Sequence, residues 1–373
     1  MGYPVWAEID IGALVHNMRE VRGLVGRAGV MAVVKANAYG HGMVPAARVL
    51  VDSGADWLAV ARGTEAMELR RGGVGAPILV LGYVHPDECR GLLDEGVRFT
   101  AYDAGLIADL AGVAQQEDKT LRLHVKVDTG MGRLGFPCDD SGVEAVLAAA
   151  RLPKVEVEGL FSHFACADES EKSTTLEQLE RFLGFARKIE QAGMTVRYKH
   201  AANSAGVIRF PESHLDMVRP GIMLYGHFPS VETCCGADLR PAMTLKARVA
   251  QVKKVSKGFP VSYGWTYRAR GQEVLATVAA GYGDGFSRLL SGRGDVLLGG
   301  VKVPVAGRVC MDQIVVEATT VKDVAPGDEV VLFGRQGDAF LPVEELADKI
   351  GTINYEVLCA VSSRVPRIYL EQS

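Results

Sequence analysis

The sequence predicts an α/β fold, a (β/α)8 barrel of the TIM type followed by a smaller all-β domain. The first two thirds of the 373 residues alternate short apolar runs with alanine-rich or amphipathic stretches, and the last third contains short runs separated by turn residues. Apolar runs without alternation are typical of parallel strands covered by helices. The alternative, an open doubly wound sheet, predicts a Gly-x-Gly-x-x-Gly turn after the first strand. That turn is absent.

Eight apolar runs are the expected barrel strands, because eight β-α units fill a barrel of about 200 to 250 residues. Between the sixth and seventh runs, Thr174–Ala192 carries apolar residues at helical spacing and is followed by Gly193, a C-terminal cap. The eight runs are Val30–Lys35, Trp57–Ala61, Pro77–Gly82, Val97–Tyr102, Leu121–Asp128, Val157–His163, Arg197–Asn203 and Asp216–Tyr225.

The pattern changes beyond Tyr225. A connection rich in cysteine, glycine and proline, Pro229–Pro241, leads into shorter runs that predict an all-β domain. A short helix is expected over Val343–Ile350. The predicted strands are Met243–Val255, Val274–Ala279, Asp295–Leu298, Val301–Ala306, Gln313–Glu317 and Glu329–Phe333.

Composition excludes several classes of protein. A formal net charge of -4 gives no reason to expect nucleic acid or an anionic membrane as a partner. No signal peptide and no run of about 18 apolar residues is visible, so the expected location is cytoplasmic. The seven cysteines lack metal-ligand spacing, and adjacent Cys234 and Cys235 suit neither a structural disulfide nor zinc. No metal site is expected.

Lys35 ends the first apolar run, after Met31-Ala32-Val33-Val34. Burial disfavours a charged amine and frees its lone pair, which suits a lysine that forms Schiff bases. The alternative is a lysine that extends to the surface from a strand end.

Further polar residues end or follow other predicted strands, and Arg219 lies within the predicted eighth strand. The reactive groups of barrel enzymes lie where strands end and loops begin, so the convergence of these residues with Lys35 on one face predicts a pocket. The residues are Lys35, Tyr39, Arg133, His163, Asn203-Ser204 and Arg219.

A phosphate site is predicted beside this pocket. Asn203-Ser204-Ala205-Gly206 opens a helix whose backbone N–H groups suit an anion, and Gly221-Ile222 adds further amides. Simple N-capping is the alternative. A lysine with a phosphate site indicates pyridoxal phosphate, with Arg219 facing the pyridine nitrogen. Arginine does not give up its proton, so the ring would be a weaker electron sink. An Arg219 paired with Asp216 or another carboxylate is the alternative.

These motifs resemble the alanine racemase family, pyridoxal-phosphate enzymes with a fold-type III barrel. The resemblance runs from Trp6–Asp10 to Ser363–Arg367. Its most specific segments are Val33–Gly42, Asp128–Gly135, Val218–Gly226, Val261–Tyr267, Ala279–Gly285 and Gly307–Gln313.

The resemblance implies interconversion of L-alanine and D-alanine by two bases, supplying D-alanine for peptidoglycan. Lys35 would carry the cofactor and act as base on D-alanine, and Tyr263 would act as base on L-alanine. In the family the opposite subunit supplies Tyr263 and Met311, so a homodimer is expected. A phenol is a poor base at neutral pH, and His163 is the family's partner for it.

The resemblance also implies the remaining contacts. Lys126 matches a lysine that is carbamylated in several members; a neutral or ion-paired lysine is the alternative. Asp312 would support the site, and Arg133 and Met311 would contact the substrate carboxylate. The expected cofactor contacts are Lys35, Tyr39, Asn203, Ser204, Arg219, Gly221, Ile222 and Tyr355.

The family's first strand joins its β domain, so the expected domains are discontinuous. They are residues 1–12, a strand that pairs with the β domain; 13–232, the cofactor-binding barrel; and 233–373, the β domain that supplies the second base.

Three other functions compete with this reading. A serine or broad-specificity racemase would replace Tyr355 or carry an additional membrane or secretion segment. A non-catalytic pyridoxal-phosphate-binding protein would lack the β domain and Tyr263. A decarboxylase would place an acidic residue, rather than Arg219, at the pyridine nitrogen.

Overall fold

A computed structural model describes residues 2–234 and 236–371, so Cys235 lies outside the described residues. The chain forms two compact units. One comprises Ala13–Ala38 and Met43–Arg240, and the other comprises Met1–Gly12, Tyr39–Gly42 and Pro241–Ser373. We call them the barrel unit and the β unit.

In the described part of the barrel unit, eight parallel strands close into a ring, because β5 pairs with β6 and β10 pairs with β2. This confirms the predicted closed barrel. A two-residue strand, β7 (Phe136–Pro137), pairs with β6 outside the ring. The ring strands are β2 (Gly29–Val33), β3 (Trp57–Val60), β4 (Ile78–Val80), β5 (Arg98–Ala101), β6 (Leu121–Asp128), β8 (Val155–Phe161), β9 (Tyr198–His200) and β10 (Met217–Val218).

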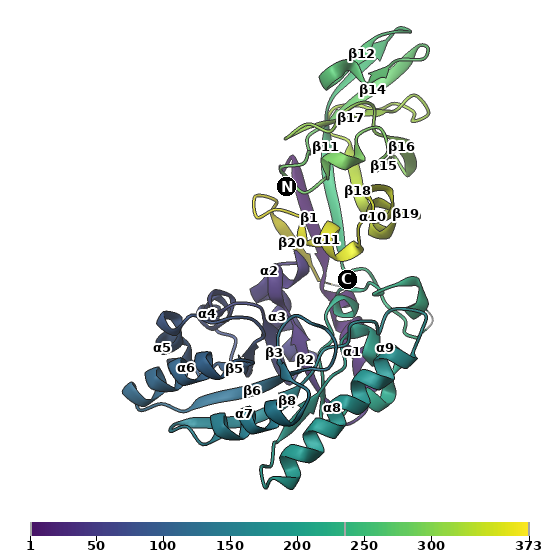
Figure 1. Cartoon of the computed structure of the whole chain (residues 1–373). Coiled ribbons are helices and arrows are strands. Elements are labelled where there is room, and N and C mark those ends of the chain that lie inside the picture. The colour runs from purple at the N-terminus through teal and green to yellow at the C-terminus, as the bar shows by residue number, and fades with distance from the viewer. Residues whose placement is uncertain (1, 235, 372–373) are drawn as a thin grey trace. The chain divides into compact units, whose positions relative to one another are not determined.

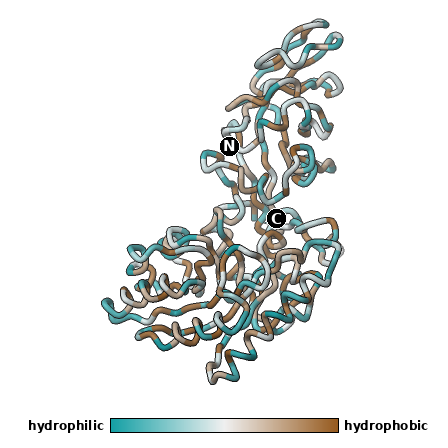
Figure 2. The backbone as a smooth tube through the Cα atoms, viewed as in Figure 1, coloured by the Kyte–Doolittle hydropathy of each residue, from teal (hydrophilic) through white to brown (hydrophobic). Residues whose placement is uncertain are grey.

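Helices surround this ring (Figure 1). Most residues of these strands are buried, as expected for strands covered on both faces. Hydrophobic segments recur through the barrel unit (Figure 2). The helix predicted over Thr174–Ala192 is α8. The helices are α1 (Ile11–Val25), α3 (Met43–Asp52), α4 (Gly63–Arg71), α5 (Pro86–Asp94), α6 (Ala104–Gln116), α7 (Asp140–Ala150), α8 (Ser173–Gln191) and α9 (Ser204–Arg209).

One predicted strand is much shorter than expected. Of the run Asp216–Tyr225, only Met217–Val218 pairs as β10, and Ile222–Tyr225 forms a 3-10 helix. Pro220 has no N–H to donate to a strand ladder, and Gly221 has φ -121 and ψ -93, so the extended chain stops there. Arg219 therefore follows the strand rather than lying within it.

The β unit is built on the long strand β11 (Met243–Val255), which pairs with β1 (Val5–Asp10), β14 (Glu273–Val278) and β18 (Glu329–Gln336). The pairing of β1 confirms that the first strand joins this domain. The remaining elements are β12 (Pro260–Val261), β13 (Tyr267–Arg268), β15 (Asp295–Leu298), β16 (Val301–Pro304), β17 (Ile314–Glu317), β19 (Ala339–Leu341), α10 (Val343–Ile350), α11 (Asn354–Cys359) and β20 (Arg367–Leu370).

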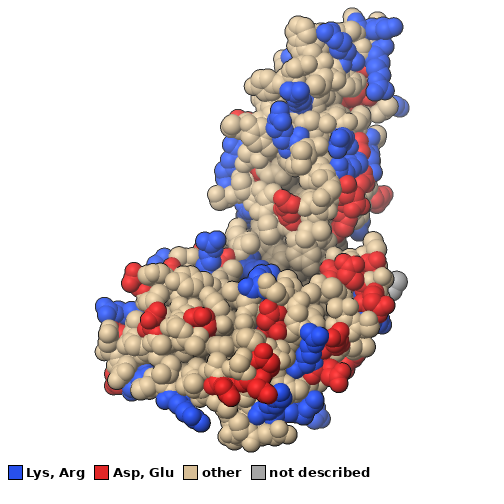
Figure 3. Space-filling model, in the orientation of Figure 1, with Lys and Arg blue, Asp and Glu red and all other residues tan. Residues whose placement is uncertain are grey.

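Acidic and basic side chains are interspersed on the face drawn in Figure 3. Within residues 2–234 and 236–371, no helix is both long and apolar enough to cross a membrane.

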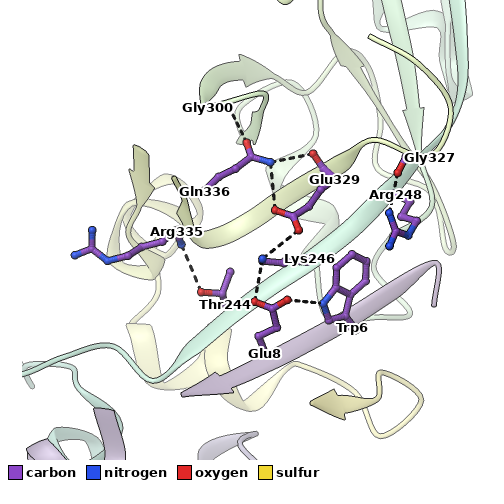
Figure 4. A network of polar contacts seen from close by, with 10 residues as sticks. All are labelled: Trp6, Glu8, Thr244, Lys246, Arg248, Gly300, Gly327, Glu329, Arg335 and Gln336. Carbon is purple, nitrogen blue, oxygen red and sulfur yellow. Dashed lines mark hydrogen bonds and ion pairs between the residues drawn. The ribbon is translucent and has the colours of Figure 1, made fainter. Parts of the chain in front are cut away.

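A polar network joins three strands of the β unit (Figure 4). Lys246 on β11 lies 2.9 Å from a Glu8 oxygen on β1 and 3.1 Å from a Glu329 oxygen on β18. Trp6 donates its indole N–H to Glu8 at 3.0 Å. Burial alone would lower the pKa of Lys246, but its hydrogen bonds to Glu8 and Glu329 raise it.

Lys246→Met is expected to lower the free energy of unfolding by about 2 kcal/mol, because two half-buried carboxylates would lose the cation between them. Urea unfolding measures this cost. The control is Lys302→Met, since Lys302 pairs with Glu345 at 2.7 Å but has a side chain 46% exposed. That variant should lose less than about 1 kcal/mol. Equal losses of unfolding free energy in the two variants would contradict the prediction that the partly buried Lys246 stabilises the β unit more than an exposed ion pair does.

Candidate active site

Four basic side chains, one on a barrel strand and three on the segments that follow barrel strands, lie near His163. Burial lowers the pKa of His163 well below its usual value, and the nearby charges of Arg219, Lys126, Arg133 and Lys35 lower it further. The imidazole is therefore neutral at physiological pH. The structure thus brings His163 close to Lys35, Lys126, Arg133 and Arg219, and the positive charges of these four residues make this part of the barrel suited to an anionic ligand.

Lys126 lies on β6 and is 4% exposed. Burial, followed by the charges of Arg133 and Arg219, lowers its pKa to about 8. Its amine lies 5.9 Å from the centre of the Phe161 ring. At neutral pH about a tenth of Lys126 is therefore uncharged, far more than for a lysine with an ordinary pKa.

The loop after β6 that leads to Arg133 is held by Asp128, whose carboxylate accepts hydrogen bonds from the N–H groups of Gly130 and Gly132 at 3.0 and 3.1 Å. Gly135 then approaches the strand so closely that a Cβ atom would lie 2.5 Å from the Asp128 nitrogen. Asp128 and Gly135 therefore hold the backbone of the loop that carries Arg133.

Arg219 is buried and is held by neutral groups. It donates to the carbonyl oxygens of Ser162 at 2.7 Å and Ala201 at 3.1 Å, and it lies 2.8 Å from His200 Nδ1. The Asp216 carboxylate instead accepts from the Lys199 N–H at 2.8 Å. Burial lowers the pKa of Arg219 to about 9, so it stays a cation at neutral pH. The pairing with Asp216 considered from the sequence does not occur.

At the expected phosphate site, the Asn203 side chain caps α9 by accepting the Gly206 N–H at 2.9 Å. This is the N-capping that the sequence offered as the alternative to a phosphate site. The buried Ser204 hydroxyl oxygen accepts the Gly221 N–H at 2.9 Å. Because this oxygen is already an acceptor, its hydrogen points elsewhere and can be donated to a ligand. Ile222, also buried, directly follows Gly221. Ser204 and the Gly221-Ile222 backbone therefore lie together.

The chain leaves Lys35 in an unusual conformation that was not predicted. Ala36, Asn37, Ala38 and Tyr39 all have φ between 52° and 56°. This left-handed turn is labelled α2 (Lys35–Tyr39) and costs about 1–2 kcal/mol per residue. Strain of this kind clusters at functional sites.

Glu65, at the start of α4, stabilises this turn. Its carboxylate accepts the Ala36 N–H and the Ala61 N–H, each at 2.7 Å. It therefore joins the segments that follow β2 and β3. No sequence signal identified Glu65, because the two segments meet only in the folded barrel.

Two further groups of predicted residues lie in the β unit. In the first, the rings of Tyr39 and Tyr355 have centroids 6.0 Å apart. Burial, and then the nearby Cys359, raise the pKa of Tyr39. Close packing holds this segment, because a Cβ on Gly40 would lie 2.3 Å from the Leu358 carbonyl oxygen.

The second group lines an open hollow that contains Tyr263, Met311, Asp312 and Cys310. Tyr263 is 70% exposed and Met311 is 53% exposed. Arg364 holds Asp312 at 2.8 Å. Tyr263 and Met311 therefore share one exposed surface of the β unit.

A closed barrel with basic groups at its strand ends, together with a β unit that takes back the first strand, defines a barrel enzyme for a small anionic ligand. The family model for the alanine racemase N-terminal domain matches residues 9–229, and that for the alanine racemase C-terminal domain matches residues 242–369. The chain belongs to the alanine racemase family, which uses pyridoxal 5'-phosphate.

Individual relatives agree. The chain is 49% identical over 372 residues to the alanine racemase of Desulforamulus reducens, covering 99% of this chain and 100% of that protein. Among solved structures, alanine racemase from Clostridium difficile 630 has a TM-score of 0.96 and 39% identity, covering 100% of this chain and 97% of that one. Bacillus anthracis alanine racemase with bound L-Ala-P has a TM-score of 0.94 and 38% identity, with 99% and 96% covered.

Proposed function

We propose that this chain is a pyridoxal-phosphate-dependent alanine racemase that interconverts L-alanine and D-alanine and supplies D-alanine for peptidoglycan. The basic cluster around His163, which includes Lys35, is the observation that carries the proposal, and the family match over nearly the whole chain supports it. We expect the enzyme in the cytoplasm.

The residues present fit the cofactor. A phosphate is an anion, and the barrel edge has an excess of buried or half-buried positive charge together with the Ser204 hydroxyl as a donor. When bound, pyridoxal phosphate supplies a ring that withdraws electrons from the substrate's α carbon. Lys35 would hold its aldehyde carbon and Arg219 would face its ring nitrogen. The groups proposed for the phosphate are Tyr39, Ser204, Gly221, Ile222 and Tyr355, and Asn203 is proposed as a further cofactor contact.

Racemisation removes the proton of the α carbon from one face and returns a proton to the other. We assign the proton on the D-alanine face to the Lys35 amine and that on the L-alanine face to the Tyr263 hydroxyl. A phenol needs a nearby hydrogen-bond donor or positive charge if it is to act as a base at neutral pH. We assign that role to His163, because a neutral imidazole still carries one ring N–H and the cation of Arg219 lies 3.4 Å from its Nδ1.

Arg133 and Met311 are the proposed contacts of the substrate carboxylate, since the planar guanidinium binds both carboxylate oxygens. Asp312 would support Met311 through its ion pair with Arg364. With a pKa of about 8, Lys126 has the uncharged amine that reacts with carbon dioxide. The carbamate would then place a negative charge beside Arg133.

The exposure of Tyr263, Trp265 and Met311 supports a homodimer, because large apolar side chains gathered at a surface are commonly covered by a partner. We propose that Tyr263 and Met311 act in the site of the opposite subunit.

The purified chain supplied with pyridoxal phosphate should be yellow and should racemise L-alanine. Borohydride reduction followed by peptide mass spectrometry should locate the cofactor on Lys35. Assays on L-alanine and L-serine measure the substrate preference, and the chain without cofactor is the control. A colourless protein that takes up no pyridoxal phosphate would contradict the proposal, and faster turnover of serine would indicate a serine racemase.

A further inference from the structure

A row of polar side chains crosses the interior of the barrel from Arg219 to Glu158. Arg219 Nη1 lies 2.8 Å from His200 Nδ1. His200 Nε2 lies 2.8 Å from His124 Nδ1. His124 Nε2 in turn lies 3.7 Å from a Glu158 oxygen, and that oxygen accepts from Arg98 Nε at 3.0 Å. The row therefore connects Arg219 with the carboxylate of Glu158, a residue that is not among the proposed cofactor or substrate contacts.

Packing fixes the two imidazoles in the row. His124 and His200 have no exposed surface. The Phe161 ring stacks on His200 with centroids 4.9 Å apart and planes 5° from parallel. Gly159 leaves the space for the other ring, since a Cβ at this position would lie 2.6 Å from His124 Nδ1. Neither ring can turn over without repacking the barrel core.

The chemistry of Arg219 sets the direction of every hydrogen bond in the row. A guanidinium only donates, so His200 Nδ1 must accept and must carry no proton. Burial lowers the pKa of both histidines, so both are neutral. His200 consequently carries its proton on Nε2 and donates to His124 Nδ1, and His124 carries its proton on Nε2 as well.

Glu158 lies at the end of the row as a hydrogen-bond acceptor, and this matches the N–H that His124 directs toward it. Burial alone would raise its pKa, but contacts with His124 and Arg98 lower it to about 2, so it is an ionised acceptor at neutral pH. Among the described residues, His124 Nε2 has no hydrogen-bond partner within the usual distance. The carboxylate at 3.7 Å is thus the negative group that faces its N–H.

We propose that Glu158 is a positioning residue for the reaction: through His124 and His200 it holds the Arg219 guanidinium against the cofactor ring. A carboxylate at the far end polarises each imidazole toward Arg219, which makes His200 Nδ1 a stronger acceptor. The proposal rests on the proposed function only for the final contact with the ring nitrogen.

The first test is ¹⁵N NMR of the wild-type holoenzyme with labelled histidine, with His124→Asn and His200→Asn used to assign signals among the eight histidines. Both Nδ1 atoms should resonate as unprotonated nitrogens and both Nε2 atoms as protonated ones. A protonated Nδ1 on either histidine would overturn the proposal. This measurement does not depend on activity. A chain that shows the expected tautomers but does not racemise alanine would refute the proposed function alone.

The second test compares Glu158→Gln with Glu156→Gln. Glu156 lies two residues earlier on β8 and pairs with Arg122 at 3.2 Å, but at the exposed surface. The amide that Glu158→Gln introduces can direct an N–H donor toward His124, whereas the N–H on His124 Nε2 requires an acceptor. We expect Glu158→Gln to lower kcat about 10-fold with KM changed less than about twofold, the scale on which indirect orienting contacts act.

The same substitution should shift the His124 nitrogen signals, whereas Glu156→Gln should change neither kcat nor the spectrum. A folded Glu158→Gln enzyme with wild-type kcat and nitrogen shifts would overturn the proposal, as would equal losses of kcat in both variants. If Glu158→Gln does not fold, the tautomers of His124 and His200 in the wild-type holoenzyme test the proposal instead.

Discussion

Lys35→Ala is expected to reduce racemisation about 10⁴-fold or more in both directions. One amine is proposed both to hold the cofactor and to carry a proton, and loss of either role alone removes several orders of magnitude. Lys35 is half-buried and follows buried Val34, and its charge acts on Lys126 and His163. Its amine is therefore close enough to Lys126 and His163 to act on them electrostatically. Circular dichroism of the alanine solution measures the rate in each direction.

A small amine in the buffer separates the chemical role of Lys35 from a structural one. Methylamine should restore part of the lost rate, because it can take the place of the missing proton carrier. Lys199→Ala is the matched control, since Lys199 lies on β9 and pairs with Glu190 at 2.8 Å away from the proposed site. It should keep activity within about twofold. A Lys35→Ala enzyme that retains a tenth of the wild-type rate would refute the assignment.

Much of the fold could be predicted because buried parallel strands leave a strong signal. Leu121–Asp128 and Met243–Val255 form strands with the predicted limits. In both, β-branched and other apolar residues largely alternate with polar ones, so local sequence and burial favour the same structure. The helix Val343–Ile350 was equally clear, since its apolar residues recur at helical spacing.

The sequence did not reveal features that depend on contacts between distant segments. The left-handed turn from Ala36 to Tyr39 contains no glycine, and its stabilising partner Glu65 lies 29 residues beyond Ala36. Likewise, His124 and His200 are 76 residues apart and meet only when the barrel closes. A lone histidine in an apolar strand gives no sign of its neighbour, so the row behind Arg219 could not be predicted.

Tyr263→Phe is expected to reduce racemisation about 10²- to 10⁴-fold while leaving cofactor binding unchanged. The hydroxyl is the proposed proton carrier on the L-alanine face, and Lys35 is intact. In D₂O the variant should therefore still exchange the α hydrogen of D-alanine, whereas exchange from L-alanine should fall with racemisation. Equal loss of exchange from both enantiomers would contradict a base specific to L-alanine.

Tyr267→Phe is the matched control for the Tyr263 variant. Tyr267 lies four residues further along the same hairpin and donates to Glu273 at 2.8 Å. Its loss removes a hydroxyl of the same kind and should affect stability by about 1 kcal/mol without changing the ratio of the two exchange rates.

Mixed dimers of Lys35→Ala and Tyr263→Phe subunits test whether the site is shared between subunits. If Tyr263 acts in the partner's site, each mixed dimer contains one site with both substitutions and one with neither. Random mixing in equal amounts should then restore about a quarter of the wild-type activity, because half of the dimers are mixed and half of their sites are intact. If Tyr263 acted within its own subunit, every site would carry one substitution and no activity would return. Recovery would show that the exposed Tyr263 of one chain completes the Lys35 site of another.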